Sequence, residues 1–290
     1  MNQAGFNINL GLRPHFDFWK TSRFDLSLNR PLVMGIVNVT PDSFSTHPAP
    51  KHASMAIAEA KALALAGADV LDIGAESTRP GATPLTSVEE WTRLEPVLRE
   101  VLTWNLPVSV DTYHPDTMRL ALDMGVDIIN DIGALRHGNA LAVVATYSCG
   151  LCLMHMHGEP RTMQISPMQG DAINVVKDFF TAQFERTDAA SINRQRIVID
   201  PGIGFGKTVD QNFQLLARQS ELHALLSPLL VGWSRKSSLG AVTGLEVQDR
   251  LIPSVTAAVL AVERGAAIVR VHDVAATVSA LAVWAAAQRL

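Results

Sequence analysis

The sequence predicts an α/β fold, a single (β/α)8 TIM barrel preceded by a short N-terminal extension. Eight short apolar runs recur along the 290 residues, helix-like segments separate them, and a polar side chain stands near the carboxyl end of almost every run. Alternation of eight strands with helices over this length is typical of one closed parallel barrel. The runs are residues 32–39, 69–75, 107–112, 127–131, 150–156, 196–200, 228–234 and 267–273.

The segments between the runs carry helix signals. Ser87-Val-Glu-Glu90 matches a capping box ahead of apolar residues at helical spacing. Four segments stop at a glycine just before a strand, as expected where a helix ends in the left-handed conformation. These glycines are Gly67, Gly125, Gly150 and Gly265. A doubly wound open sheet is the alternative, but it needs a Gly-rich loop after the first strand, where this sequence has NVTPDSFS.

Domain organisation and partner class follow from composition. We expect residues 1–30 to form an extension over the bottom of the barrel and residues 31–290 to form the barrel domain.

The net charge of −4 and the lack of a Lys/Arg run predict neither a nucleic-acid nor a membrane partner. No apolar run is long enough to span a bilayer, and the first twenty residues lack a signal-peptide layout. The expected location is the cytoplasm.

Three local patterns suggest chemistry that we consider weaker. Cys149 and Cys152 form a C-x-x-C, but if both are extended they point to opposite faces, so we interpret them as small buried hydrophobic residues. The segment 201–208 resembles a phosphate loop, although its spacing is wrong. His155-Met-His157 could offer two imidazoles on one face of a strand, yet no third zinc ligand follows at clear spacing.

Polar residues at the carboxyl ends of the runs are the most informative feature. In a barrel these ends converge on one mouth, where the active sites of this fold lie. A single strand-terminal Asp often only caps a loop, but so many in register indicate an enzyme or a protein that binds a polar ligand. The residues are Asn38, Asp72, Asp111, Asn130, His155, Asp200, Ser234, Arg270 and His272.

The strand-end segments resemble the dihydropteroate synthase family, in the family's order and over nearly the whole chain from Pro31 onward. NVTPDSFS alone would be a hint, whereas all eight segments together are highly specific. The segments are Met34–Ser45, Glu76–Gly81, Ser109–Thr112, Ile129–Ile132, Leu153–Met156, Ile199–Lys207, Ser234–Ser237 and Arg270–Asp273.

The resemblance implies a pterin site and a transferase reaction. The enzyme would condense 6-hydroxymethyl-7,8-dihydropterin pyrophosphate with p-aminobenzoate, giving 7,8-dihydropteroate and pyrophosphate in folate biosynthesis. A carboxylate can accept two parallel N–H donors from the pterin edge, which is the role implied for Asp200. The other implied pterin-binding residues are Asp111, Asn130, Met154, Lys236 and Arg270.

The resemblance also implies an anion site, a Mg2+ ion and a p-aminobenzoate pocket. Asn38 would bind Mg2+ and, through it, pyrophosphate, which Arg270 and His272 would also contact. The expected p-aminobenzoate pocket comprises Thr78, Arg79, Pro80, Phe205, Ser237 and the stem of Lys236. Arg79, Lys236, Arg270 and His272 are the expected catalytic residues. No covalent nucleophile is required, because pyrophosphate can depart ahead of attack from a benzylic-like carbon.

One departure from the family pattern affects the expected activity. Thr46-His47-Pro48 stands where the family usually has Asp-Gly-Gly, so a charge is lost and the loop is stiffer. Two alternatives follow: a catalytically weak pterin-binding paralogue, or a related pterin-dependent methyltransferase barrel. Segments 234–237 and 270–272 speak against the methyltransferase, which has no pyrophosphate to bind. The resemblance further suggests a homodimer.

Overall fold

The computed structural model describes residues 16–39, 49–77, 83–159, 163 and 165–288. Eight parallel strands lie in the order β8-β7-β6-β5-β4-β3-β10-β9, and a parallel bridge between Ile199 and Leu229 joins the two outer strands. The barrel is therefore closed, and the open-sheet alternative is wrong. The strands are β3 (Leu32–Asn38), β4 (Val70–Gly74), β5 (Val108–Asp111), β6 (Ile128–Asp131), β7 (Gly150–Met154), β8 (Ile197–Asp200), β9 (Leu230–Val231) and β10 (Ile268–Val271).

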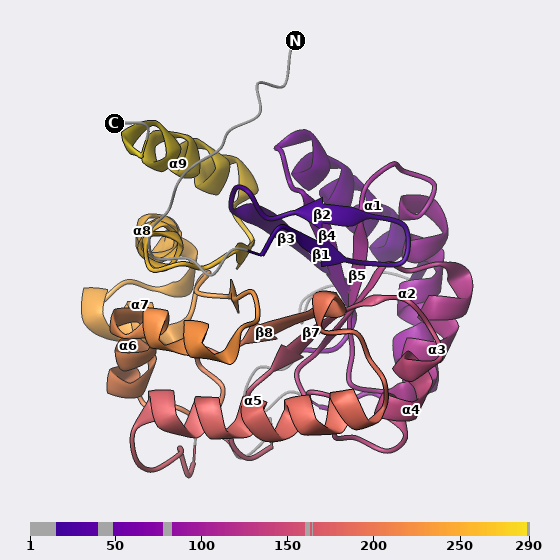
Figure 1. The fold of residues 1–290 in the computed structure, drawn as a ribbon. Helices are drawn as coiled ribbons and strands as arrows, with labels where there is room; N and C mark the ends of the chain where they lie inside the picture. Colours follow the sequence, from indigo (N-terminus) through magenta and orange to yellow (C-terminus); the bar gives the residue numbers. More distant parts are fainter. Residues whose placement is uncertain (1–15, 40–48, 78–82, 160–162, 164, 289–290) are drawn as a thin grey trace.

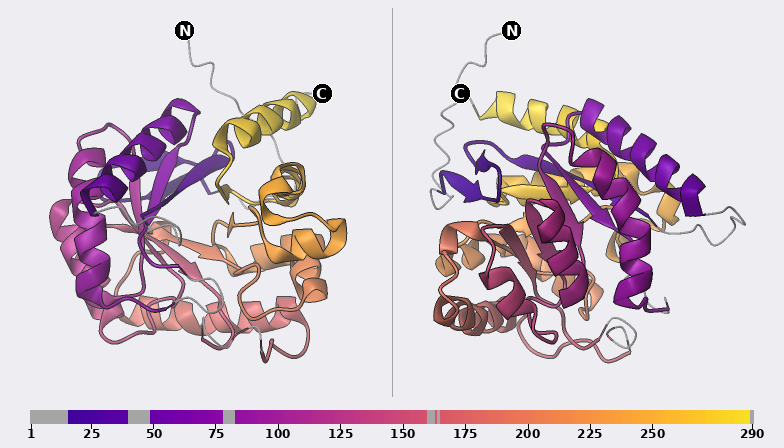
Figure 2. Two further views of the ribbon diagram at one scale, coloured as in Figure 1. Left: turned by 180° about the vertical axis from the view of Figure 1, so that it is seen from behind. Right: turned by 90° about the vertical axis from the view of Figure 1, so that its right-hand side faces the viewer.

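Helices surround the strands, as Figures 1 and 2 show. One α-helix follows each strand except β9, which is followed by two. All eight predicted strands are confirmed, and helices occupy the segments between them. The described α-helices are α1 (Ala49–Leu65), α2 (Ser87–Val101), α3 (Pro115–Met124), α4 (Ala140–Ala145), α5 (Ala172–Ala189), α6 (Val209–Ala217), α7 (Ser237–Thr243), α8 (Leu251–Glu263) and α9 (Val274–Ala287).

The capping box of α2 lies one residue earlier than predicted. Thr86 is the N-cap: its hydroxyl accepts a hydrogen bond from the Glu89 amide at 3.2 Å, and Glu89 Oε2 accepts one from the Thr86 amide at 2.8 Å. Residues 86–89 and 87–90 both fit the pattern, and Thr86 takes the role because Ser87 is already the first helical residue. Glu90 is consequently free of the cap and points inward.

Three of the four glycines end helical segments, but Gly150 does not. Gly67, Gly125 and Gly265 have φ of +97°, +100° and +91°, the left-handed conformation that was predicted. Gly150 is instead the first residue of β7. A Cβ at this position would lie 3.1 Å from Trp19 Nε1 and from Thr21 Cγ2, so close packing rather than backbone conformation favours glycine there.

A two-stranded hairpin covers the amino-terminal ends of the barrel strands. It comprises β1 (Phe18–Lys20) and β2 (Asp25–Ser27). Trp19 is fully buried, packs into the same apolar cluster as Met34 and Ile128, and donates from Nε1 to the carbonyl of Arg196 at 2.8 Å. This agrees with an extension over the barrel's bottom, while the domain boundary at residue 30 stays a prediction.

The main core lies between the strands and the helices. Cys149 is buried in it, whereas Cys152 is buried in the cluster around Trp19. Both are free thiols, and burial raises the pKa of both, as expected for inert core residues. No α-helix in the described part of the chain is long and apolar enough to cross a membrane.

Candidate active site

Four strand-end side chains form a bonded group at the carboxyl mouth of the barrel. Arg270 on β10 donates from Nε to Asp72 Oδ2 on β4 at 2.5 Å and from Nη2 to Asp111 Oδ2 on β5 at 2.7 Å. Asn130 on β6 donates to the same Asp72 oxygen at 3.0 Å. The parallel strands thus bring together residues up to 198 positions apart, and Arg270 is held in one orientation by two carboxylates.

Burial controls the electrostatics of this group. It raises the pKa of Asp111 to about 7, although Arg270 opposes the shift. For Arg270, burial lowers the pKa but Asp72 and Asp111 more than compensate, so the guanidinium remains charged. Asp72 Oδ1 is buried and has no hydrogen-bond partner within the described part of the protein. The mouth therefore holds a fixed cation, Arg270, beside a carboxylate, Asp111, that burial makes costly to ionise.

Asp200 lies at the end of β8 on the same mouth. Its side chain is 7% exposed, Oδ1 accepts a hydrogen bond from the Gly202 amide at 2.7 Å, and burial raises its pKa. Oδ2 accepts no hydrogen bond from the residues that the structure describes, and Gly202 N is the donor that fixes the orientation of the carboxylate. A buried carboxylate in this state suits a ligand that presents N–H donors.

Two lysines follow β8 and β9, and only one is available for a ligand. Lys207 is 2% exposed and donates to the carbonyls of His155, Gly202 and Phe205 at 3.3, 2.9 and 3.1 Å. It orders the loop after β8, which explains why the phosphate-loop resemblance of 201–208 was misleading. Lys236 places Nζ 4.3 Å from the Phe205 ring centroid, and burial lowers its pKa to about 8, with Asp200 opposing.

An apolar group lies next to the charged one. Met154, Met156, Met163 and Ile132 form a buried cluster, against which Phe205 and Tyr113 pack. Met154 directly follows Cys152 and Leu153 on β7 and is 3% exposed. The mouth thus offers a flat hydrophobic wall beside hydrogen-bonding groups, which is the combination that a polar heterocycle needs.

The remaining predicted residues are placed as follows. His272 Nδ1 lies 2.9 Å from Ser234 Oγ, which also accepts from the His272 amide at 3.2 Å. Asn38, the last residue of β3, and Ser237, the first of α7, are exposed. Thr78, Arg79 and Pro80, and the unusual Thr46-His47-Pro48, lie outside the described residues.

Asp72 is a residue of the mouth to which the sequence argument assigned no role. It appeared only as one polar strand end among nine, yet it is the partner of both Arg270 and Asn130. Its signal was a charged residue inside a run of otherwise apolar, fully buried positions. The structure agrees with the decision against a zinc site at His155-Met-His157, because β7 ends at Met154, His155 is buried and His157 is exposed.

Comparisons with known proteins agree with this geometry. The profile of a family described as "Pterin binding enzyme" matches residues 34–272. Dihydropteroate synthase of Neisseria meningitidis serogroup B is 47% identical over 275 residues, which is 92% of this chain and 96% of the relative. The chain belongs to the dihydropteroate synthase family.

Solved structures of the family have the same fold. Xanthomonas albilineans dihydropteroate synthase with 4-aminobenzoic acid superposes with a TM-score of 0.85 at 47% identity, covering 92% of this chain and 96% of that one. Burkholderia cenocepacia dihydropteroate synthase complexed with 7,8-dihydropteroate gives 0.85 at 46%, covering 93% and 96%. The predicted family and the predicted barrel are both confirmed.

Proposed function

We propose that this chain is a transferase that joins 6-hydroxymethyl-7,8-dihydropterin pyrophosphate to p-aminobenzoate, releasing pyrophosphate and 7,8-dihydropteroate. Membership of the dihydropteroate synthase family supports this, as do family structures that hold 4-aminobenzoic acid or dihydropteroate. The observation in this chain that carries the proposal is the group at the mouth, where Arg270 is fixed by Asp72 and Asp111 beside Asp200. The family match gives the methyltransferase alternative no support.

The pterin ring fits between the charged and apolar groups of the mouth. Asp200 would accept the adjacent N–H donors of the ring edge through its oxygen that is not bonded to Gly202. Asp111 and Asn130 would bond the rest of the polar rim, and Lys236 would donate to the carbonyl side. Met154 would pack beneath the ring, with the planar cation of Arg270 above it.

The reaction breaks the C–O bond between the exocyclic CH2 and pyrophosphate and forms a C–N bond to the amine of p-aminobenzoate. The amine then loses a proton, and pyrophosphate leaves with the bonding electrons. The protein's contributions are to stabilise the departing charge with Arg270 and His272 and to hold the amine in line. The Ser234 hydroxyl, 2.9 Å from His272 Nδ1, would keep Nε2 turned toward the anion.

Mg2+ is the proposed metal, with Asn38 as its protein ligand. The exposed Asn38 side chain at the end of β3 offers one carboxamide oxygen. Magnesium prefers oxygen and retains waters, so one side-chain ligand plus substrate phosphates is a suitable set. When bound, the ion would supply neutralisation of the pyrophosphate charge.

The p-aminobenzoate pocket would lie beside Phe205 at the mouth. Phe205 and the stem of Lys236 lie together at the mouth, and Ser237 follows at the start of α7. Thr78, Arg79 and Pro80 would complete the pocket from outside the described residues. Arg79 would bind the carboxylate, because its planar fork matches that group.

Steady-state kinetics on two proteins tests the proposal and the paralogue alternative together. We expect the natural chain to release pyrophosphate and dihydropteroate when given both substrates and Mg2+. The triple variant Thr46→Asp, His47→Gly and Pro48→Gly should lower the KM for p-aminobenzoate and leave pterin affinity nearly unchanged, because strand ends hold pterin whereas loops enclose p-aminobenzoate. Turnover by the triple variant alone would make the natural chain a pterin-binding paralogue, and turnover by neither would reject the proposal.

We further propose a cytoplasmic homodimer. Helices α7, α8 and α9 carry exposed apolar side chains, among them Val242, Ile252 and Val283 at 59%, 75% and 72% exposure, which a partner subunit would cover. Sedimentation equilibrium at micromolar concentration should give twice the chain mass of 31.3 kDa. A monomer at that concentration would reject the dimer.

A further inference from the structure

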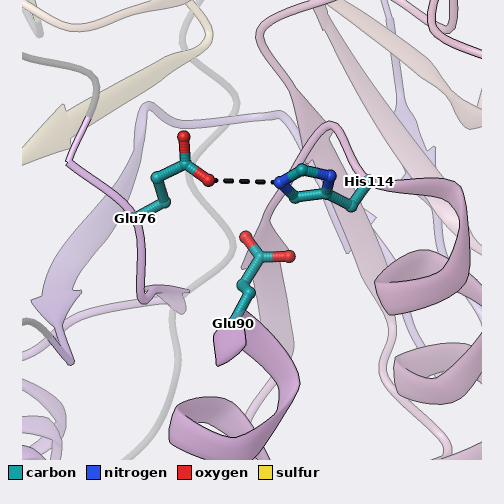
Figure 3. A group of neighbouring side chains, drawn as sticks. All are labelled: Glu76, Glu90 and His114. Carbon is teal, nitrogen blue, oxygen red and sulfur yellow. Dashed lines mark hydrogen bonds and ion pairs between the residues drawn. The ribbon is translucent and has the colours of Figure 1, made fainter. Parts of the chain in front are cut away.

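Three metal-ligating side chains meet behind the mouth, apart from the groups used above. Glu76 follows β4, Glu90 lies in the first turn of α2, and His114 immediately precedes α3. Figure 3 shows the three side chains converging, with the Glu90 carboxylate pointing between the other two. One potential ligand atom from each lies within 4.8 Å of the others.

Hydroxyl groups around the cluster orient both carboxylates. The Tyr113 hydroxyl donates to Glu76 Oε1 at 2.7 Å, and the Thr112 hydroxyl donates to Glu90 Oε2 at 2.7 Å. The second oxygen of Glu76, Oε2, is bonded to His114 Nε2 at 3.2 Å, whereas the second oxygen of Glu90, Oε1, has no hydrogen-bond partner among the described residues. Outer-shell donors of this kind are what fixes carboxylate ligands in metal sites.

Glu90 is the unusual member of the three. The residue is 0% exposed, and its Oε1 has no hydrogen-bond partner among the described residues. Burial raises its pKa, whereas the nearby Thr117 and Thr112 hydroxyls lower it. The Thr117 hydroxyl does not reach hydrogen-bond geometry with Oε1 and is itself buried without a partner. A buried carboxylate oxygen in this state needs a proton or a cation.

The spacing and the donor types favour a particular class of cation. His114 Nε2 and Glu76 Oε2 form a hydrogen bond at 3.2 Å, a separation that also matches the roughly 3.3 Å between neighbouring ligands at tetrahedral zinc distances of about 2.0–2.1 Å, and the Glu90 ligand atom lies within 4.8 Å of both. One imidazole with two carboxylates suits Zn2+ or Co2+, whereas Mg2+ and Ca2+ prefer all-oxygen sites. With three protein ligands, the fourth position would go to water.

We propose that Glu76, Glu90 and His114 form a binding site for a divalent transition metal, Zn2+ or Co2+, separate from the proposed Mg2+ position at Asn38. The bound ion would join the end of β4, the start of α2 and the loop between β5 and α3 through one centre. The proposal does not depend on the proposed reaction, because its test is binding.

The experiment is titration of the full chain with ZnCl2 by calorimetry, without Mg2+ or substrates, supported by the visible spectrum of the CoCl2 complex. We expect one ion per chain and a tetrahedral Co2+ spectrum. Glu90→Gln preserves size and removes a ligand charge, and His114→Ala removes the imidazole from a side chain that is 20% exposed. Each should weaken binding at least tenfold while circular dichroism remains that of the natural chain.

Two matched variants serve as controls. Glu95→Gln changes a carboxylate on the same helix that is paired with Arg99 at the surface, and His157→Ala removes an exposed imidazole near the mouth. Both should bind Zn2+ as the natural chain does. The proposal is overturned if the natural chain binds no Zn2+, in which case Glu90 is merely protonated, or if the two ligand variants bind as well as the controls.

Discussion

The two ends of the barrel are built from the same eight strands but serve opposite purposes. At the amino-terminal end the inward side chains are apolar, with Trp19 of the hairpin inserted among Met34, Ile128 and Cys152. At the carboxyl end the inward positions hold charged residues such as Asp72 and Arg270. The strands separate the apolar layer at one end from the charged layer at the other. A substitution can therefore alter the free energy of unfolding without altering ligand affinity, or the reverse. Substitutions in one layer should leave the property of the other nearly intact.

The largest expected effect concerns the apolar end. Trp19→Ala removes a fully buried indole and the hydrogen bond to the Arg196 carbonyl, and should lower the free energy of unfolding by about 3–5 kcal/mol. Phe18→Ala, at a neighbouring side chain that is 47% exposed, should cost far less. Urea unfolding of both variants gives the values. Pterin affinity measured under folding conditions should be unchanged, and a parallel loss of affinity would contradict the separation of the two layers.

At the charged end we expect the reverse. Asp200→Asn turns a double acceptor into a group with a donor facing donors, so pterin affinity should fall at least tenfold, or about 1.5–3 kcal/mol. Calorimetric titration with pterin pyrophosphate in the absence of p-aminobenzoate measures this, with Asp210→Asn on the exposed side of α6 as the matched control. Unchanged affinity would remove Asp200 from the pocket. Urea unfolding should show little change, because Asp200 is already costly to ionise.

A smaller effect should follow from pH. The folded-state pKa of Lys236 is lowered to about 8 by burial, so the ammonium that would contact pterin is lost as pH rises through 8. That of Asp111 is raised to about 7, so its carboxylate forms only as pH rises through 7. Pterin affinity should therefore be highest between these values and fall up to tenfold at one pH unit above 8. The Lys236→Met variant should bind pterin more weakly, and its pterin affinity should not fall above pH 8. If the affinity of this variant still falls above pH 8, another titrating group causes the fall.

The sequence predicted the barrel because the fold depends on patterns that repeat. Eight apolar runs and their polar ends are visible without coordinates, and the residues of the mouth, including Asp111, Asn130 and Asp200, followed from them. Choices between neighbouring residues were harder. Thr86 and Ser87 fit the capping pattern equally, and only the start of α2 distinguishes them.

Features that depend on contacts between distant segments could not be predicted. The close approach of Trp19, 131 positions earlier, favours glycine at position 150, and nothing near either residue in the sequence reveals this. Asp72 is bonded to Arg270, which is 198 positions away in the sequence. Glu90 lies close to Glu76 and His114 because of how α2 packs in the folded structure. In each case the partner is set by which strands lie side by side, a property of the closed barrel and not of any local pattern.

The hairpin that closes the barrel's lower end has a consequence for how the chain is made. Its residues are synthesised before the barrel strands, yet Trp19 donates a hydrogen bond to the carbonyl of Arg196, 177 positions later. Its indole also packs with Leu230 and Ile268, which emerge later still. For most of synthesis, therefore, the native surface that this apolar segment packs against is incomplete, although domains usually acquire their contacts from the N-terminus onward. A segment that is synthesised before every barrel strand therefore completes its native contacts only after the last of those strands.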